Sequence, residues 1–161
     1  MATDLIKHTC CFTGHRPEKL TAPESAVRAR LAEEIGKAAE KGYISFISGM
    51  ARGFDIWAAE AVLALKEKRP DIRLICAVPH PGFEKSRSFR EKAEYERIIS
   101  SADKVHTVSD RYFSWCYQVR NRWMVNRSSL VIAGYSGIPS GTRNTILYAE
   151  ENSVPVINIL D

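Results

Sequence analysis

The segment 48–55 combines glycines, an arginine and an aspartate at a point where the secondary structure is expected to change, and reads Ser-Gly-Met-Ala-Arg-Gly-Phe-Asp. It follows a short apolar run over residues 43–47 and leads into an alanine-rich helical pattern. A strand that ends at glycine and feeds a helix leaves unpaired backbone N–H groups at the helix start, where the helix dipole also favours negative charge. These residue types therefore predict a site for an anion, typically phosphate.

Two further glycine-bearing loops resemble this segment, one over residues 13–17 (Thr-Gly-His-Arg-Pro) and one over residues 136–142 (Ser-Gly-Ile-Pro-Ser-Gly-Thr). Arginines lie inside the first two loops and directly after the third. Three loops of this kind favour a phosphate-bearing ligand over three unrelated turns, because arginine presents a planar fork that suits phosphate. We expect the phosphate-facing floor of the site to consist of Gly14, Arg16, Gly49, Gly53, Arg120, Gly141 and Thr142.

Three other residues in these loops have two interpretations each. His15 could contact the ligand or lie on the surface, and Arg52 could grip phosphate or brace a neighbouring carboxylate. Asp55 could be a ligand-binding group, but its position favours the N-cap of the following helix. All three are retained as candidate ligand-binding residues.

Several functional classes are excluded or disfavoured by what the loops contain. The loop 13–17 is not G-x-G-x-x-G, and no acidic residue closes the second expected strand to hold a ribose, so an ordinary NAD-dependent dehydrogenase is disfavoured. No Ser–His–Asp arrangement, pair of catalytic carboxylates or metal-binding cluster can be recognised. We therefore assign no catalytic residue and expect neither a metal nor a resident cofactor.

The composition is that of an ordinary globular domain. The chain has 161 residues, of which 45% are hydrophobic and 26% charged, and no apolar run approaches the ~20 residues of a membrane span. Without a recognisable secretion signal we expect a cytoplasmic protein that does not bind membranes. The four cysteines have no metal-binding spacing, and most are expected to be small core residues. The net charge of +4 is mild, although residues 111–149 contain no acidic residue and include Arg111, Arg120, Arg122, Arg127 and Arg143.

The elements that must position these residues alternate regularly along the chain. Strands are expected at residues 8–13, 44–48, 72–78, 104–108, 130–135 and 154–160, and helices at residues 22–41, 55–68, 86–101, 115–127 and 142–152. A capping box of Thr21 and Glu24 is expected at the first helix. The pattern predicts an α/β fold with one doubly wound, Rossmann-like parallel sheet of about six strands and helices on both faces. With the strand order 3-2-1-4-5-6, the ligand crevice would lie between the first and fourth strands.

Taken together, these loops resemble the YpsA-like branch of the SLOG superfamily, which includes DNA-processing protein A (Smf) and the Lonely Guy phosphoribohydrolases. The similar Smf segment reads S-G-x-A-x-G-I-D, and its S-G-[ST] loop has a counterpart at residues 140–142, ahead of a helix that ends in Tyr148 and Ala149. The resemblance covers nearly the whole chain. It implies a single Rossmann-like domain over residues 1–161 that binds a nucleotide or nucleotide-derived ligand, with a possible homodimer.

The catalytic part of the Lonely Guy pattern is incomplete in this chain. Those enzymes carry P-G-G-x-G-T-x-x-E and an upstream R-K-x-x-M; here Arg120 and Met124 are kept, Asn121 replaces the lysine and Thr145 stands where the acid would be. A carboxylate normally stabilises the oxocarbenium-like state of glycosidic hydrolysis, so the resemblance implies binding rather than catalysis.

Three functions follow as expectations. The first is a sensor or regulatory module for a nucleotide-derived small molecule. The second is a Smf-like single-stranded nucleic-acid binding protein that uses the arginine-rich fourth helix and exposed aromatic residues. The third is a nucleotide N-glycosidic hydrolase whose carboxylate comes from Asp55 or Glu60.

Overall fold

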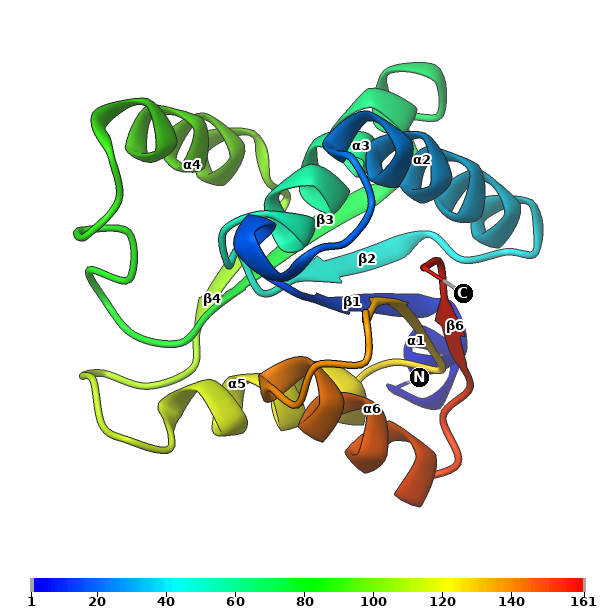
Figure 1. Cartoon of the computed structure of the whole chain (residues 1–161). Helices are drawn as coiled ribbons and strands as arrows, with labels where there is room; N and C mark the ends of the chain where they lie inside the picture. The colour runs from blue at the N-terminus through cyan, green and yellow to red at the C-terminus, as the bar shows by residue number, and fades with distance from the viewer. Residues whose placement is uncertain (1, 161) are drawn as a thin grey trace.

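A single parallel sheet forms the centre of the molecule in the computed structural model, which describes residues 2–160 (Figure 1). Every pairing in the sheet is parallel, which confirms the expected α/β, Rossmann-like class. The strands lie in the order β4-β3-β2-β1-β5-β6. Their bounds are β1 Thr9–Gly14, β2 Ser45–Ser48, β3 Arg73–Val78, β4 Lys104–Thr107, β5 Leu130–Gly134 and β6 Val156–Asn158.

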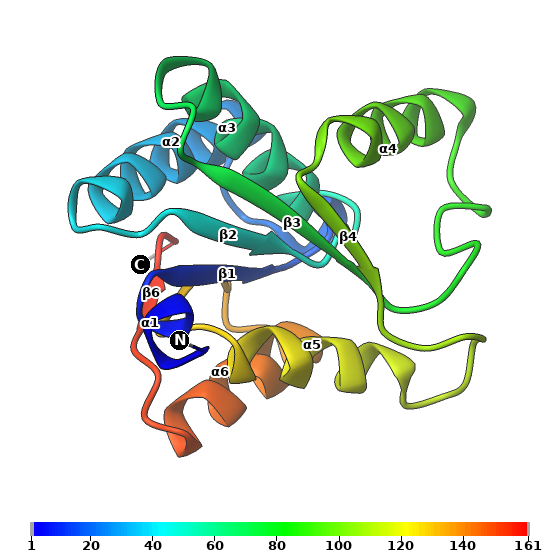
Figure 2. The ribbon, with the colours of Figure 1, turned by 180° about the vertical axis from the view of Figure 1, so that it is seen from behind.

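Helices cover both faces of this sheet, as the views from the front and from behind show (Figures 1 and 2). The helices α2, α3 and α4 lie on one face, and α5 and α6 lie on the other. The adjacent residues Cys10 and Cys11 point to opposite faces of the sheet, so Cys10 lies in one hydrophobic core and Cys11 lies in the other. All four cysteines are buried. The helices are α1 Ala2–Lys7, α2 Glu24–Glu40, α3 Phe54–Lys68, α4 Phe89–Ser101, α5 Cys116–Asn126 and α6 Gly141–Glu151, with a 3₁₀ turn at Pro17–Lys19.

The strand order differs from the expected 3-2-1-4-5-6. The strand β4 lies at the far edge beyond β3, and β5 rather than the fourth strand pairs with β1. The point where the strand order reverses therefore lies between β1 and β5. The crevice still collects the loops that follow these two strands, because the carboxyl ends of parallel strands meet at one edge of the sheet.

The N-terminal cap of α2 also differs from the expectation. The expected capping box of Thr21 and Glu24 is wrong, since α2 begins at Glu24 with Pro23 as N-cap and no side-chain cap. A capping box does form at α4, where Ser88 and Glu91 bond reciprocally.

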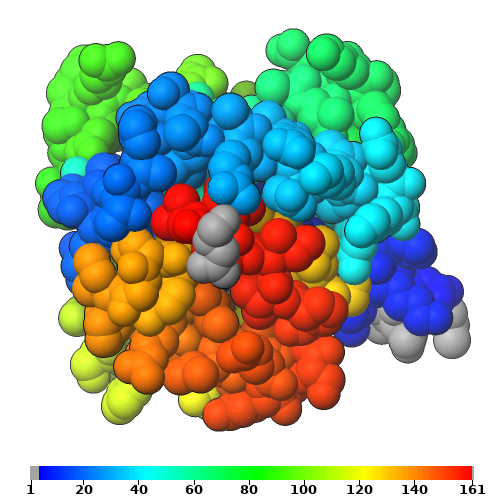
Figure 3. All heavy atoms as spheres, turned by 45° about the vertical axis from the view of Figure 1, so that its right-hand side comes forward, coloured from blue at the N-terminus to red at the C-terminus, as the bar shows by residue number. Residues whose placement is uncertain are grey.

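The short strand β6 forms one edge of the sheet and is visible as the red segment between α2 and α6 (Figure 3). Across residues 2–160 no helix has both the length and the apolar character that crossing a membrane requires.

Candidate functional site

A hollow of about 700 Å³ opens at the carboxyl ends of β1, β2 and β5, and we refer to it as the crevice. Pockets of roughly 300–1,000 Å³ are typical of small-molecule sites. Two of the candidate glycines, Gly49 and Gly53, are buried outside its lining. The structure brings the other candidates together in its wall: Gly14, His15, Arg16, Arg52, Asp55, Arg120, Gly141 and Thr142.

Gly14 makes room for a protein side chain at the floor of the crevice. It pairs with Gly134 across β1 and β5, and the ring of Phe54 packs against both glycines. A Cβ atom added at Gly14 would lie 2.2 Å from that ring, and one at Gly134 would lie 2.5 Å from it. The absence of a side chain at Gly14 thus allows Phe54 to pack beneath the crevice.

Gly49 and Gly53 also serve packing and backbone geometry. A Cβ atom at Gly49 would lie 2.8 Å from the Arg120 guanidinium. Gly53 has a φ of +84°, a conformation that side chains disfavour, and its missing Cβ leaves space for the ring of Pro17. The glycines of segment 48–55 therefore support the crevice from behind instead of lining it.

Two buried arginines hold the loop between β2 and α3. Arg120 of α5 donates to the carbonyl oxygen of Gly49, and Arg87 donates to that of Met50 at 2.6 Å. Both residues are at most 9% exposed. Met50 itself adopts a φ of 62°, the left-handed region that is uncommon for a residue with a side chain. The arginines thus bind and stabilise a strained turn beside the crevice.

Two N–H groups of this loop are occupied within the loop. The amide of Met50 donates to Ser48 Oγ at 3.2 Å, and the amide of Ala51 donates to Asp55 Oδ2 at 3.3 Å. Asp55 also places a negative charge in the first turn of α3. At the start of α3, which the glycine pattern of this segment predicts as an anion site, a carboxylate of the protein already accepts one of the amides.

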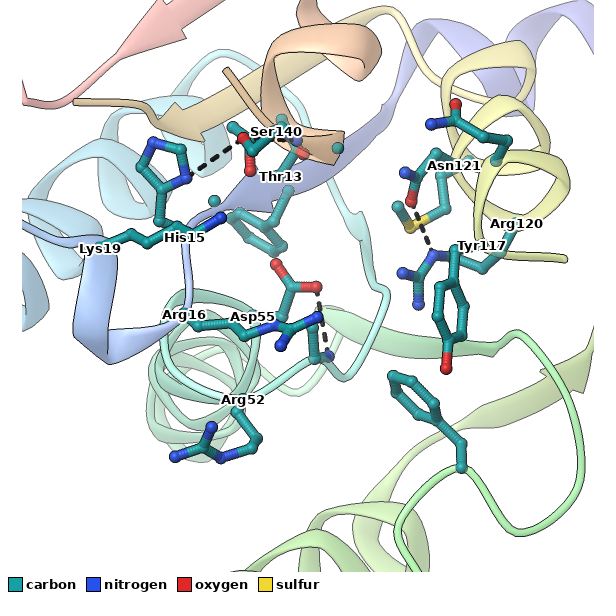
Figure 4. A pocket seen from close by; sticks show the side chains of 18 of the residues that line it. Thr13, His15, Arg16, Lys19, Arg52, Asp55, Tyr117, Arg120, Asn121 and Ser140 are labelled. Carbon is teal, nitrogen blue, oxygen red and sulfur yellow. Dashed lines mark hydrogen bonds between the residues drawn. The ribbon is translucent and has the colours of Figure 1, made fainter. Parts of the chain in front are cut away.

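The interpretation of Asp55 as an N-cap is wrong. Gly53 is the N-cap of α3, whereas Asp55 lies inside the first turn and is only 5% exposed. Its Oδ1 atom is buried and has no hydrogen-bond partner among the described residues. Burial raises the pKa of Asp55 to about 6, and the charge of Arg120 opposes this shift. Asp55 is thus an incompletely satisfied carboxyl group in the wall of the crevice (Figure 4).

Arg52 braces neighbouring carboxylates, the second of its two interpretations. Its guanidinium lies 2.8 Å from Glu91 and 3.0 Å from Glu18. The side chain is 36% exposed and still borders the crevice, but its charge is already shared between two acidic partners. A ligand phosphate would have to compete with these carboxylates for Arg52.

The start of α6 has the opposite electrostatic character to that of α3. It has no acidic residue in its first turn, and Arg143 lies there. Ser140 caps the helix by accepting the Thr142 amide at 3.2 Å, and the other amides of a first turn have no partner within a helix. Thr145 donates to the Gly141 carbonyl and supplies no carboxylate. This helix start suits an anion.

His15 and two exposed cations complete this side of the crevice. His15 is buried, in contrast to a surface position, and its Nδ1 lies 3.3 Å from Ser140 Oγ. Burial lowers the pKa of His15, and the charge of Lys19 lowers it further. Arg16 and Lys19 are exposed and form no ion pair among residues 2–160. They are the cations here that are most available to a ligand.

Aromatic residues form the wall opposite these cations. Tyr117 of α5 and Phe83 line the crevice, with ring centroids 5.7 Å apart. His80 and Tyr112 extend this cluster outward, with centroids 5.4 Å apart. The sequence patterns did not identify Phe83, Lys19 and Arg87, because these residues lie outside the glycine loops. Trp115 is 68% exposed, whereas Trp123 is half-buried and stacks on His106.

The two acidic residues proposed as a substitute catalytic carboxylate lie in different places. Asp55 lines the crevice, whereas Glu60 lies outside its lining and contacts Arg28 and Arg97 at 3.5 and 3.8 Å. Glu60 is therefore separated from the candidate site.

Comparison with known sequences identifies the group to which this architecture corresponds. A family model described as the YspA SLOG family matches residues 10–153. The chain is 36% identical over 118 residues to the uncharacterised SPbeta prophage-derived protein YoqJ of Bacillus subtilis (strain 168), covering 66% of this chain and 69% of that protein. It is 24% identical over 156 residues to a UPF0398 protein of Bacillus thuringiensis (strain Al Hakam), covering 91% of this chain and 84% of that protein.

Solved structures of low sequence identity share the fold. DNA processing protein A of Streptococcus pneumoniae matches with a TM-score of 0.62 and 16% identity, over 95% of this chain, which spans half of that protein. DNA processing protein A of Helicobacter pylori, whose structure concerns single-stranded DNA binding, matches with a TM-score of 0.64 and 18% identity over 96% of this chain and 66% of that one. A molybdenum cofactor binding protein of Rippkaea orientalis matches with a TM-score of 0.59 and 20% identity, over 94% of this chain and 76% of that one.

Proposed function

The chain belongs to the YspA SLOG family, and we propose that its crevice binds a nucleotide or nucleotide-derived ligand and that the protein acts as a sensor or regulatory module. The observation that carries this proposal is the charge of the crevice wall. Two acidic residues line it, Asp55 and Glu91, against five basic ones: Arg16, Lys19, Arg52, Arg87 and Arg120. Such an excess of cations suits a phosphorylated ligand.

The phosphate end of the ligand is assigned to the start of α6. First-turn amides, the helix dipole and the absence of an acidic residue favour an anion there. Arg16 and Lys19 come from the loop after β1, which His15 and Ser140 connect to the start of α6. A phosphate at this position would be neutralised from two elements at once.

Binding without an evident reaction favours a sensor over an enzyme. The position that carries an acid in the Lonely Guy pattern is Thr145, whose hydroxyl bonds to a backbone carbonyl. Arg87 and Arg120, although cationic, are engaged with the loop carbonyls of Met50 and Gly49. The groups of the crevice are thus arranged to hold a ligand, and a bound ligand would bridge the loops that follow β1, β2 and β5.

The proposal is tested with the protein as purified. Native mass spectrometry of a gently isolated sample should reveal a co-purified nucleotide, and AMP, ADP and ADP-ribose should raise the melting temperature of ligand-free protein. A ligand at 100 times its Kd adds about 2.7 kcal/mol, which shifts Tm by several degrees in a domain of this size. No co-purified nucleotide, together with no shift at millimolar concentrations, would refute the proposal.

Single-stranded nucleic acid is the second candidate ligand, and a separate surface favours it. Tyr112 and Trp115 are 61% and 68% exposed just before α5, where bases could stack. However, Arg122 and Arg127 of that helix stack on Tyr148 and Trp123, with guanidinium-to-ring distances of 5.0 and 4.2 Å. Because these arginines lie outside the crevice lining, substitutions can separate the two candidate functions.

A further inference from the structure

We propose that the crevice recognises a ribose phosphate, with the carboxylate of Asp55 accepting a hydrogen bond from a ribose hydroxyl. This inference rests on the proposed function, because it specifies which part of a nucleotide-derived ligand lies at the centre of the crevice. It assigns Asp55 a role in selecting ligands, distinct from the cations that hold the phosphate.

The unpaired oxygen of Asp55 is the first observation. Oδ2 accepts the amide of Ala51, whereas Oδ1 is buried without a partner among the described residues. The positive charges of Arg120 and Arg87 act on Asp55, but neither arginine forms an ion pair with it among the described residues. Arg120 donates instead to the carbonyl of Gly49, and Arg87 donates to that of Met50. A buried carboxylate oxygen without a donor is unfavourable, so a ligand that supplies a donor gains affinity here.

The chemistry of this position limits which ligand group can lie there. An ionised carboxylate only accepts hydrogen bonds and repels a phosphate. Hydroxyl groups of a sugar are neutral donors and satisfy both conditions. The phosphate must therefore lie away from Asp55, which agrees with the acid-free start of α6 as the anion site.

The order of the groups across the crevice is the second observation. In Figure 4, Asp55 lies between His15 and Lys19 on one side and Tyr117 and Arg120 of α5 on the other, and the Arg16 side chain extends from the first side across the view of Asp55. The first side carries the free cations, and the second carries an aromatic wall. A nucleotide has the same order of phosphate, ribose and base, so a single ligand can place each part against a suitable surface.

The shape of the backbone explains how an acid reaches this position. The second strand ends at Ser48 without an acidic residue, but the turn to Asp55 folds back on it, and Ser48 Oγ donates to the Asp55 carbonyl at 2.8 Å. The carboxylate is thereby returned to the end of β2, where an acid that binds ribose lies in dinucleotide-binding folds. It comes from the following helix instead of from the strand.

Matched nucleotides test this inference on the unmodified protein. Titration calorimetry at neutral pH with AMP, 2′-deoxy-AMP and 2′,3′-dideoxy-AMP should show AMP binding about 10-fold or more tighter than the dideoxy compound, the range of a hydrogen bond to a charged group. The 2′-deoxy compound identifies which hydroxyl Asp55 accepts. Asp55→Asn should reduce the preference for AMP to within about threefold, while the control Asp71→Asn, an exposed residue paired with Arg69, should keep it.

The outcomes separate this inference from the proposed function. Equal affinity of the unmodified protein for AMP and the dideoxy compound would overturn the role of ribose and leave nucleotide binding intact. An undiminished preference in Asp55→Asn would overturn the role of Asp55. Failure of all three compounds and of ADP-ribose to bind would overturn both proposals.

Discussion

The hydroxyl of Ser140 lies 3.3 Å from Nδ1 of His15, so the start of α6 and the loop after β1 are joined at the base of the crevice. The same hydroxyl accepts the amide of Thr142 and caps the helix. Ser140 therefore connects the stability of α6 to the position of a histidine that lines the candidate site.

Ser140→Ala should affect both stability and binding. Loss of an N-cap costs about 1 kcal/mol, which urea denaturation measures as a lower midpoint. The affinity for AMP should also fall, because the first turn of α6 and His15 lose a common partner. Ser88→Ala removes the corresponding cap of α4 and serves as the control. If both variants lose equal stability and neither loses affinity for AMP, α6 is not the anion site.

Gly14→Ala should destabilise the protein by about 1–3 kcal/mol, the usual range for overpacking. The added methyl group would lie 2.2 Å from the Phe54 ring. The double variant Gly14→Ala with Phe54→Leu should be less destabilised than the two separate effects add to, because the smaller side chain relieves the clash. Gly141→Ala is the control, since no atom lies within 4 Å of its added Cβ. Strict additivity in denaturation experiments would contradict the packing role of Gly14.

Arg120→Ala should weaken AMP binding and also destabilise the fold. This arginine is only 6% exposed and donates to Gly49 and to Asn121. Removing it leaves a buried carbonyl without its donor, at a cost of about 1–3 kcal/mol. Calorimetry and urea denaturation report the two effects. Arg30→Ala, at an exposed arginine of α2, should produce neither, and full stability in Arg120→Ala would contradict a supporting role.

The stability difference between Asp55→Asn and the unmodified protein should depend on pH. The folded-state pKa of Asp55 is raised to about 6, so folding favours the protonated form, and its contribution to stability is lost as the pH rises toward this value. Between about pH 4.5 and pH 7 the unmodified protein should lose about 2 kcal/mol relative to the variant. Urea denaturation at both pH values measures this change. Asp71→Asn is the control, and a constant difference for Asp55→Asn would show that its carboxyl group is not desolvated.

Nucleotide affinity should decrease on acidification through the same pH range. An ionised Asp55 carboxylate accepts hydrogen bonds at both of its oxygen atoms. In the protonated form one oxygen carries a proton, so the group is a weaker acceptor. The charged groups that act on it from neighbouring elements are Arg120 on α5 and Arg87 before α4. Burial lowers the pKa of His15, which lines the same crevice, below its ordinary value. Titration of AMP at several pH values checks this, with Asp55→Asn expected to show a weaker dependence.

Single-stranded DNA should bind poorly at physiological salt, with a Kd in the nonspecific range of ~10⁻⁴–10⁻⁶ M. The net charge is only +4, and Arg122 and Arg127 are stacked on aromatic rings outside the crevice. Fluorescence anisotropy with a labelled oligonucleotide at several salt concentrations measures this affinity. Tight binding that is lost in the Arg122→Ala, Arg127→Ala double variant but kept in Arg16→Ala would favour the nucleic-acid function.

The sequence by itself determined the parallel sheet and which loops meet in the crevice. Alternating apolar runs and helical patterns predict parallel strands, and the carboxyl ends of such strands must meet at one edge. The loops that contain Gly14 to Arg16 and Gly141 to Thr142 therefore meet in the crevice, although β4, the strand expected beside β1, lies at the far edge. Loop convergence was predictable because it follows from strand direction more than from strand order.

Only the tertiary structure decided what each loop does. Glycine at residue 14 indicates a backbone without a side chain, but only the packing of Phe54 shows that a protein ring fills the space. Likewise, Arg120 donates to Gly49, a residue 71 positions away in the chain, and no local pattern predicts this contact. Asp55 is unsatisfied because the arginines around it bind carbonyl oxygens instead, and that choice depends on distances fixed by how α3 and α5 pack on opposite faces of the sheet.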